Sequence, residues 1–311
     1  MKYFMGPYVW EETVADIDAA GHERVDRLED AEAYINTSPN PAKIPDMPGN
    51  IGFIQHCFTG VEGLIEAGLI SEGGLRWANS AGAFATPVAE SALGLLLSQA
   101  HQHKAFALAA DWSVAGQLDK QQAWLYSSAG REPKTVVVLG AGGIGKRLIG
   151  LLAPFGLHVI AVNNSGREVA GANETFALKE AGEVWGRADF VVNILPLTQE
   201  TNRLIDASFF ARLKPSAIFV NVGRGATVVT DDLVQALQDG TIAGAGLEVV
   251  DPEPLPDGHP LYALPNCTMT PHIAASQRVA RFHMGPVFDA NARAFAAGER
   301  MPTEVNPEAG Y

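Results

Sequence analysis

Short runs of hydrophobic residues alternate along the chain with longer amphipathic stretches. The runs are rich in β-branched residues, which is typical of parallel strands covered on both faces. They predict strands over residues 2–5, 33–36, 51–56, 136–139, 158–162, 190–193, 217–221, 243–249 and 267–269. Apolar residues at helical spacing predict helices over 14–20, 85–97, 206–213, 231–238 and 277–297. Strands that alternate with helices imply parallel sheets with right-handed crossovers, and therefore an α/β fold.

A glycine pattern follows one of these strands in the middle of the chain. Gly140, Gly142 and Gly145 have the spacing G-x-G-x-x-G, and Gly143 and Ile144 complete the turn. The first glycine permits a tight turn, the second lets a pyrophosphate approach the backbone, and the third lets the helix pack closely on the strand. The N–H groups at the helix N-terminus attract phosphate. The unit therefore predicts dinucleotide binding, and a βαβ unit that binds nothing is the alternative.

The length of the chain, 311 residues, suits two domains. Residues 1–97 have a βαβ-like pattern without the glycines, and the helix over 277–297 is expected to return to them. The predicted division is a discontinuous first domain of residues 1–97 and 276–311 and a dinucleotide-binding domain of residues 98–275. We expect two Rossmann-like or flavodoxin-like domains, each a doubly wound parallel sheet, with a cleft between them.

Charge and cysteine content narrow the classes of function. The chain has 35 acidic and 22 basic residues and a net charge of −13, so nucleic acid and anionic membranes are poor partners for it. Its two cysteines, Cys57 and Cys267, predict neither a disulfide framework nor a zinc site, and no metal is expected. The chain begins without a signal-peptide core, and no apolar run reaches about 18 residues. We therefore expect a cytoplasmic protein.

Three ionisable residues follow successive predicted strands of the second domain: Arg224, Glu253 and His272. Ligands of open α/β sheets bind beyond the carboxyl ends of the strands, so these residues are candidates for catalysis. Each also has a structural interpretation. The arginine can bind a carboxylate of the protein, the glutamate can be solvated between its prolines, and the histidine can be a satisfied residue at a strand end. Their occurrence beside a predicted cofactor site favours catalysis.

Several stretches of the sequence resemble the D-isomer-specific 2-hydroxyacid dehydrogenase family. They are VVVLGAGGIGKRL, NILPLTQETNRLID, FVNVGRG, GAGLEVVDPEPLP and TPHIAAS, and the C-terminal VNPEAGY also resembles the family. The resemblance covers essentially the whole chain and is densest from Thr135 to Ser276. It implies an enzyme that transfers a hydride between NAD(P)H and a small 2-oxo acid or D-2-hydroxy acid, with glyoxylate or hydroxypyruvate as a candidate substrate.

The resemblance also implies roles for individual residues. Arg224 would bind the substrate carboxylate and polarise the C2 carbonyl, because a planar guanidinium can contact a 2-oxo acid at two points. His272 would donate the proton, and Glu253 would hydrogen-bond the ring and favour its protonated form. Backbone N–H groups at Thr59 and Gly60 would hold the carboxylate, unless they form an ordinary turn. The first domain would then be the substrate domain.

The end of the second cofactor strand predicts which nicotinamide cofactor is used. NAD-dependent relatives usually place an aspartate there, to accept a hydrogen bond from the ribose 2′-OH, whereas this chain has Asn163. Asn164, Ser165 and Arg167 can bind a 2′-phosphate through hydrogen bonds and charge. We therefore expect NADP(H) to be favoured over NAD(H). The alternative is a polar surface turn with Arg167 solvated and no strong preference.

Further cofactor contacts are expected at Leu195, Pro196, Val222, Gly223 and Glu248. At the last of these positions, near the nicotinamide, relatives usually carry an aspartate.

The sequence leaves two alternative functions and the oligomeric state to be decided. A cofactor-sensing protein, such as a corepressor-like scaffold, shares the expected fold. A formate-type dehydrogenase is disfavoured because it typically pairs the histidine with a glutamine and this chain has Glu253. Residues 104–132, which include Trp112 and Trp124, predict either a dimer arm or a surface elaboration. We favour the arm, and with it a homodimer.

Overall fold

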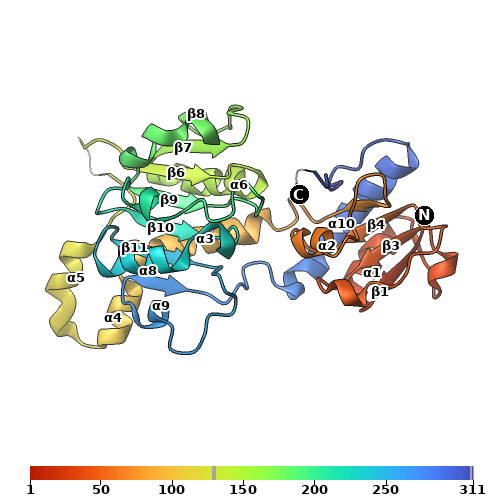
Figure 1. The fold of residues 1–311 in the computed structure, drawn as a ribbon, viewed down its shortest axis with the longest axis horizontal. Coiled ribbons are helices and arrows are strands. Elements are labelled where there is room, and N and C mark those ends of the chain that lie inside the picture. The colour runs from red at the N-terminus through yellow and green to blue at the C-terminus, as the bar shows by residue number, and fades with distance from the viewer. Residues whose placement is uncertain (128–130, 309, 311) are drawn as a thin grey trace. The chain divides into compact units, whose positions relative to one another are not determined.

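The strands of the chain pair in parallel and form two sheets, one of five strands and one of seven. This computed structural model describes residues 1–127, 131–308 and 310. The chain divides into two units, Met1–Phe84 with Ala275–Tyr311, and Ala85–Ala274. Each unit has its own sheet with helices packed on it (Figure 1). The α/β fold with parallel sheets that the sequence predicts is confirmed.

The sheet of the first unit has the strand order β2-β1-β3-β4-β5, which is the flavodoxin-like arrangement. Its strands are β1 (Lys2–Gly6), β2 (Glu23–Arg24), β3 (Ala33–Asn36), β4 (Phe53–His56) and β5 (Arg76–Ala78). Its helices are α1 (Glu11–Ala19), α2 (Glu62–Glu66) and α10 (Gln277–Ala296). Helix α10 packs against α1, and its Phe288 contacts the rings of Tyr3 and Phe53. The C-terminal part of the chain therefore completes the core of the first unit.

The sheet of the second unit has the strand order β12-β11-β10-β9-β6-β7-β8. Counted from β6, this is the Rossmann order 3-2-1-4-5-6 with one added strand. The strands are β6 (Thr135–Leu139), β7 (His158–Asn163), β8 (Glu174–Ala177), β9 (Phe190–Asn193), β10 (Ile218–Asn221), β11 (Gly244–Leu247) and β12 (Cys267–Met269). The helices are α3 (Ala85–Ala100), α4 (His103–Ala109), α5 (Ala115–Gln121), α6 (Gly143–Leu152), α7 (Ala207–Phe210), α8 (Thr230–Gln238) and α9 (Pro260–Ala263).

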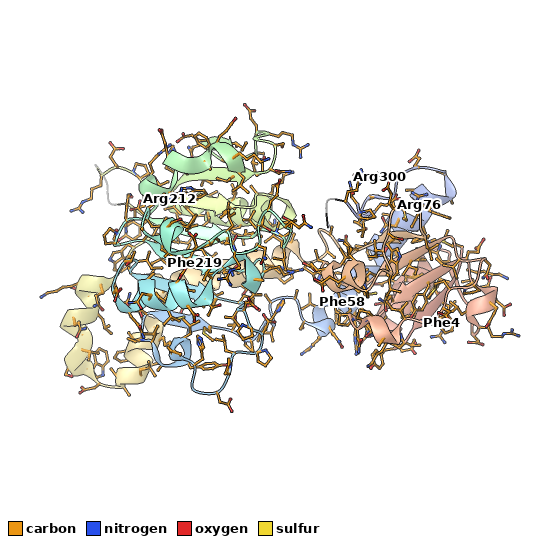
Figure 2. All side chains as sticks on the ribbon, viewed as in Figure 1. Phe4, Phe58, Arg76, Arg212, Phe219 and Arg300 are labelled. Atoms are coloured by element: carbon orange, nitrogen blue, oxygen red, sulfur yellow. The ribbon has the colours of Figure 1, made fainter. Side chains whose placement is uncertain are left out.

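Helices cover both faces of this second sheet. Helix α3 packs against α6 and against strands β10 and β11. Phe209 and Phe210 of α7 and Leu233 of α8 join a core cluster with Phe219 of β10, which is labelled in Figure 2. The sheet is therefore buried between two layers, which explains why its strands are continuous apolar runs.

Helix α3 lies in a different unit from the one that the sequence predicts. The predicted boundary falls after residue 97, whereas the units divide after Phe84 and the second unit contains all of α3. The reason is close packing, since a Cβ at Gly246 of β11 would lie 2.9 Å from Cβ of Leu95. The helix begins at Ala85, as the sequence predicts, and continues to Ala100, three residues beyond its predicted end.

The segment predicted as a dimer arm contains α4 and α5. Five of its large hydrophobic side chains are exposed whereas Leu125 is buried, and Trp112 is 82% exposed. The others are Phe106, Leu108, Trp124 and Tyr126. Residues 128–130 of this segment lie outside the described residues. A role of the segment in a homodimer stays a prediction. Over the described ranges, no helix combines the length and the apolar composition that crossing a bilayer requires.

His56 is a buried histidine at the carboxyl end of β4. Its Nδ1 lies 3.0 Å from Nδ2 of Asn36. The Oδ1 atom of Asn36 accepts a hydrogen bond from the N–H of Ser38, so the amide presents its NH₂ group to the ring. The histidine is therefore neutral, with its proton on Nε2. Burial lowers the pKa of His56 from 6.5 to about 4.

We expect the first unit to lose stability as the pH falls from 6.5 to about 4. In this window the unfolded chain binds a proton at His56 that the folded chain does not, so acid favours unfolding. At 1.36 kcal/mol per pH unit, the loss is roughly 3 kcal/mol. Hydrogen exchange of the β3 and β4 amides, corrected for the intrinsic pH dependence, measures it. The loss should be smaller in His56→Gln and unchanged in the exposed His103→Gln, and equal losses in all three proteins would contradict the prediction.

Candidate active site

The loops that follow β10, β11 and β12 carry the three ionisable candidates. These strands are neighbours in the sheet, so their carboxyl ends lie side by side. Arg224 follows β10, Glu253 follows β11, and His272 follows β12. The structure therefore places residues that are far apart in the sequence at one edge of one sheet.

His272 and Glu253 form a direct side-chain pair. The distance between Nδ1 of His272 and Oε1 of Glu253 is 2.5 Å. A carboxylate only accepts hydrogen bonds, so Nδ1 carries the hydrogen and Nε2 is the nitrogen available to a substrate. The His272 side chain is 45% exposed and that of Glu253 is 40% exposed, so solvent and ligands reach the pair. The carboxylate therefore fixes the orientation of the ring and the position of its Nδ1 hydrogen.

The pair lines a cavity of about 710 Å³ in the second unit. This volume is within the range of small-molecule sites. Leu255 and Met269 contribute apolar walls, and Lys104 contributes a cation. The Lys104 ammonium donates hydrogen bonds to the carbonyl oxygens of Leu261, Tyr262 and Cys267, and burial lowers its pKa. Lys104 therefore also ties the start of α4 to the wall of the cavity.

The loop that carries Arg224 is held by two close approaches of the backbone. A Cβ at Gly225 would lie 1.8 Å from the carbonyl oxygen of Val250, and one at Gly223 would lie 2.6 Å from that of Leu195. Only glycine fits at either position. The contact with Val250 brings the Arg224 loop against the segment that leads to Glu253. The Nη1 atom of Arg224 donates a hydrogen bond to the carbonyl oxygen of Gly223 at 3.0 Å.

Three buried polar residues hold the Arg224 loop by hydrogen bonds. The sequence pattern did not predict a role for them. Asn193 Nδ2 donates to Oδ1 of Asn221 at 2.9 Å and to Oγ1 of Thr227 at 2.8 Å. Asn221 and Thr227 in turn donate to the carbonyl oxygen of Arg224. The signal that could have found them is that β9 and β10 both end in asparagine, and the two asparagines are paired in register.

The glycine turn after β6 fits the diphosphate of a dinucleotide. Gly140 has φ +97°, and a Cβ there would lie 2.8 Å from the backbone of Ile194. A Cβ at Gly145 would lie 3.0 Å from the carbonyl oxygen of Gly140, whereas Gly142 faces open space. Gly142 is the N-cap of α6 and has no side chain to fill that space or to cap the helix. Phosphate oxygens are suited to the N–H groups at this helix N-terminus.

Asn163 shapes the turn that follows β7. Its Oδ1 accepts a hydrogen bond from the N–H of Ser165 at 3.1 Å, and its Nδ2 donates to the carbonyl oxygen of Arg167 at 2.7 Å. Asn164, Ser165 and Arg167 are exposed on this turn. The asparagine therefore holds the turn in a conformation that presents these side chains to solvent.

The other predicted contacts lie in loops at the carboxyl ends of strands. Leu195 and Pro196 follow β9, Val222 and Gly223 follow β10, and Glu248 follows β11 and is buried. Thr59 and Gly60 follow β4 in the first unit, whereas all the other candidates belong to the second. Asn79 Nδ2 donates to the carbonyl oxygen of Thr59 at 3.0 Å and holds that loop. In the part of the chain that the structure describes, no three His, Cys, Asp or Glu side chains are grouped as metal ligands would be.

Comparisons with known proteins identify the family to which the chain belongs. The model of the family described as D-isomer specific 2-hydroxyacid dehydrogenase, NAD binding domain, matches residues 93–274. The chain is 48% identical over its whole length to a Corynebacterium melassecola protein encoded in the proB 3′ region, all of which is covered. It is 36% identical over 226 residues to the glyoxylate/hydroxypyruvate reductase B of Pectobacterium carotovorum, covering 71% of this chain and 68% of that protein.

A solved structure extends the similarity to both units. The D-isomer specific 2-hydroxyacid dehydrogenase of Xanthobacter autotrophicus, in complex with NADPH and MES, has a TM-score of 0.79 and 26% identity to this chain. The match covers 100% of this chain and 99% of that one.

Proposed function

Because the chain belongs to the D-isomer specific 2-hydroxyacid dehydrogenase family, we propose that it reduces a small 2-oxo acid to the D-2-hydroxy acid with NAD(P)H. The observation that carries the proposal is the pair formed by His272 and Glu253 at 2.5 Å, on the wall of a cavity in the same unit as the glycine turn that fits a dinucleotide. This pair offers a proton at Nε2 while the carboxylate stabilises the charge of the ring.

In the proposed carbonyl reduction, each of these residues has a separate role. A bound nicotinamide cofactor supplies the hydride that reduces C2 of the oxo acid. His272 donates its Nε2 proton to the oxygen of that carbon, and Glu253 orients and stabilises the imidazolium before the transfer. Arg224 binds the substrate carboxylate and polarises the carbonyl, which stabilises the charge that develops on oxygen. Thr59 and Gly60 add backbone N–H groups from the first unit, which makes that unit the substrate domain.

The substrate that we propose is glyoxylate or hydroxypyruvate. The name of the Pectobacterium carotovorum relative supports this choice. Oxidation of NADPH and NADH in the presence of a panel of 2-oxo acids tests it, with chiral analysis of the hydroxy acid formed from hydroxypyruvate, because the product of glyoxylate has no stereocentre. A protein that binds the cofactor but reduces no member of the panel would instead be a cofactor sensor on the same fold.

We expect the wild-type enzyme to prefer NADPH, measured as the ratio of kcat/KM for NADPH to that for NADH on one substrate. The turn at residues 163–167 presents hydrogen-bond donors and the cation of Arg167, and a charged hydrogen bond contributes about 1.5–3 kcal/mol, or roughly 10- to 10²-fold. Asn163→Asp places a carboxylate where the 2′-phosphate would bind, so it should reduce the ratio at least about tenfold.

Asn163→Asp also removes the hydrogen bond to the carbonyl oxygen of Arg167, so a second variant is needed as a control. Asn163→Ala removes that hydrogen bond without adding charge. The ratio should fall further in the aspartate variant than in the alanine variant. A wild-type preference for NADH would show that this turn does not select the 2′-phosphate.

A further inference from the structure

Glu248 follows β11 directly. It is a buried residue with an exposed fraction of 3%. Its Oε2 accepts hydrogen bonds from the hydroxyl of Ser91 at 2.9 Å and from the hydroxyl of Thr270. Its Oε1 accepts one from the backbone N–H of Ala274 at 2.6 Å. A buried carboxylate is tolerated only when its oxygens are hydrogen-bonded. These three donors meet that need, and they come from α3, from the end of β12 and from the segment after His272.

The residue between two of these donors has an unusual backbone. His272 has φ +52°, in the left-handed region that residues other than glycine rarely adopt. Its backbone N–H donates to the carbonyl oxygen of Glu248 at 3.0 Å. Glu248 therefore binds the backbone at His272 through its carbonyl and the backbone at Ala274 through its carboxylate. Strain of this kind persists only where the surrounding structure imposes it.

We infer that Glu248 is a positioning residue for His272. By joining the 270–274 loop to α3, its carboxylate holds the histidine backbone in the left-handed conformation from which the ring reaches Glu253. The inference rests on the proposed function, because its catalytic consequence appears only if His272 donates a proton.

The length of the side chain matters to this role. The backbone of Glu248 is fixed beside β12, since Leu247 is paired in register with Met269. An aspartate at this position is shorter by one C–C bond, about 1.5 Å, and does not reach Ser91 and Ala274 together. The three donors also leave one of about four acceptor positions of the carboxylate for any cofactor contact.

Three variants distinguish the effect of the length of the Glu248 side chain from the effect of its charge. Glu248→Asp keeps the charge and loses reach, and Glu248→Gln keeps the length and loses the charge. Ser91→Ala removes one anchor and leaves in place every ionisable group that lines the cavity with His272, namely Lys104, Glu248, Glu253 and Tyr262. The matched control is Glu90→Gln, an exposed neighbour on α3.

We expect Glu248→Asp and Glu248→Gln to lower kcat by about 10- to 10²-fold, because small misplacements of a reacting group have effects of this size. Ser91→Ala should lower kcat in the same direction and by less. The dissociation constants of NADPH and NADH, measured by fluorescence without substrate, should change less than about threefold. A tenfold change in a dissociation constant corresponds to about 1.4 kcal/mol. Glu90→Gln should match the wild type.

A second readout does not depend on turnover. Nitrogen-15 NMR of the histidine rings identifies the Nδ1–H hydrogen bond of His272, which should weaken in Glu248→Asp and in Ser91→Ala. If no 2-oxo acid is reduced, the proposed function fails, and the NMR signal still tests the inference. Retention of that hydrogen bond in both variants would overturn it, as would an unchanged kcat with weaker cofactor binding in Glu248→Asp.

Discussion

Replacing His272 with glutamine is expected to lower kcat by about 10²–10⁴-fold, the range for the loss of a positioned general acid. This corresponds to roughly 3–5 kcal/mol of activation free energy. Glutamine retains polarity and size but has no proton to transfer at neutral pH. The Nδ1–Oε1 distance of 2.5 Å to Glu253 is the reason to expect a large effect, because the carboxylate already orients the ring.

The measurement is the steady-state rate of NAD(P)H oxidation at saturating 2-oxo acid. The dissociation constant of the cofactor, taken from fluorescence, serves as the control and should change little, because the glycine turn proposed to bind the diphosphate follows β6 and not β12. Reduction by His272→Gln at nearly the wild-type rate would mean that the proton comes from another group.

Arg224→Lys is expected to lower kcat/KM by about 10- to 10²-fold, with a higher KM for the oxo acid and a lower kcat. Lysine keeps the charge and loses the planar fork that contacts carboxylate and carbonyl together. The loss of a hydrogen bond to a charged group, about 1.5–3 kcal/mol, sets the size of the effect. Both constants should change if, as proposed, the same guanidinium binds the substrate and polarises its carbonyl.

Arg212→Lys provides the matched control. Arg212 is an exposed arginine two residues after the end of α7 in the same unit and is labelled in Figure 2. Its replacement should leave kcat/KM unchanged. If Arg224→Lys also left kcat/KM unchanged, carboxylate recognition would belong to other groups, such as the backbone at Thr59 and Gly60.

Local patterns in the sequence were sufficient for most of the fold. The run Val136–Leu139, the three glycines and the helical spacing after them predicted β6, the turn and α6, because each depends on neighbours within a few residues. Strands β2, β5 and β8 were not predicted. The first two have two and three residues, too few for a periodic signal, and β8 is an only partly buried edge strand.

The three candidates for catalysis were also indicated by the sequence, because His272, Glu253 and Arg224 each follow an apolar strand and resemble the residues of a known family. The contacts that hold these residues in place were not indicated by the sequence. The donors to Glu248 come from Ser91, 157 residues away, and from the chain 22 and 26 residues beyond it. Such contacts are invisible to local patterns because packing of α3 on the sheet brings them together. The sequence alone therefore indicated which residues are candidates for catalysis, and the tertiary structure decided what holds them in place.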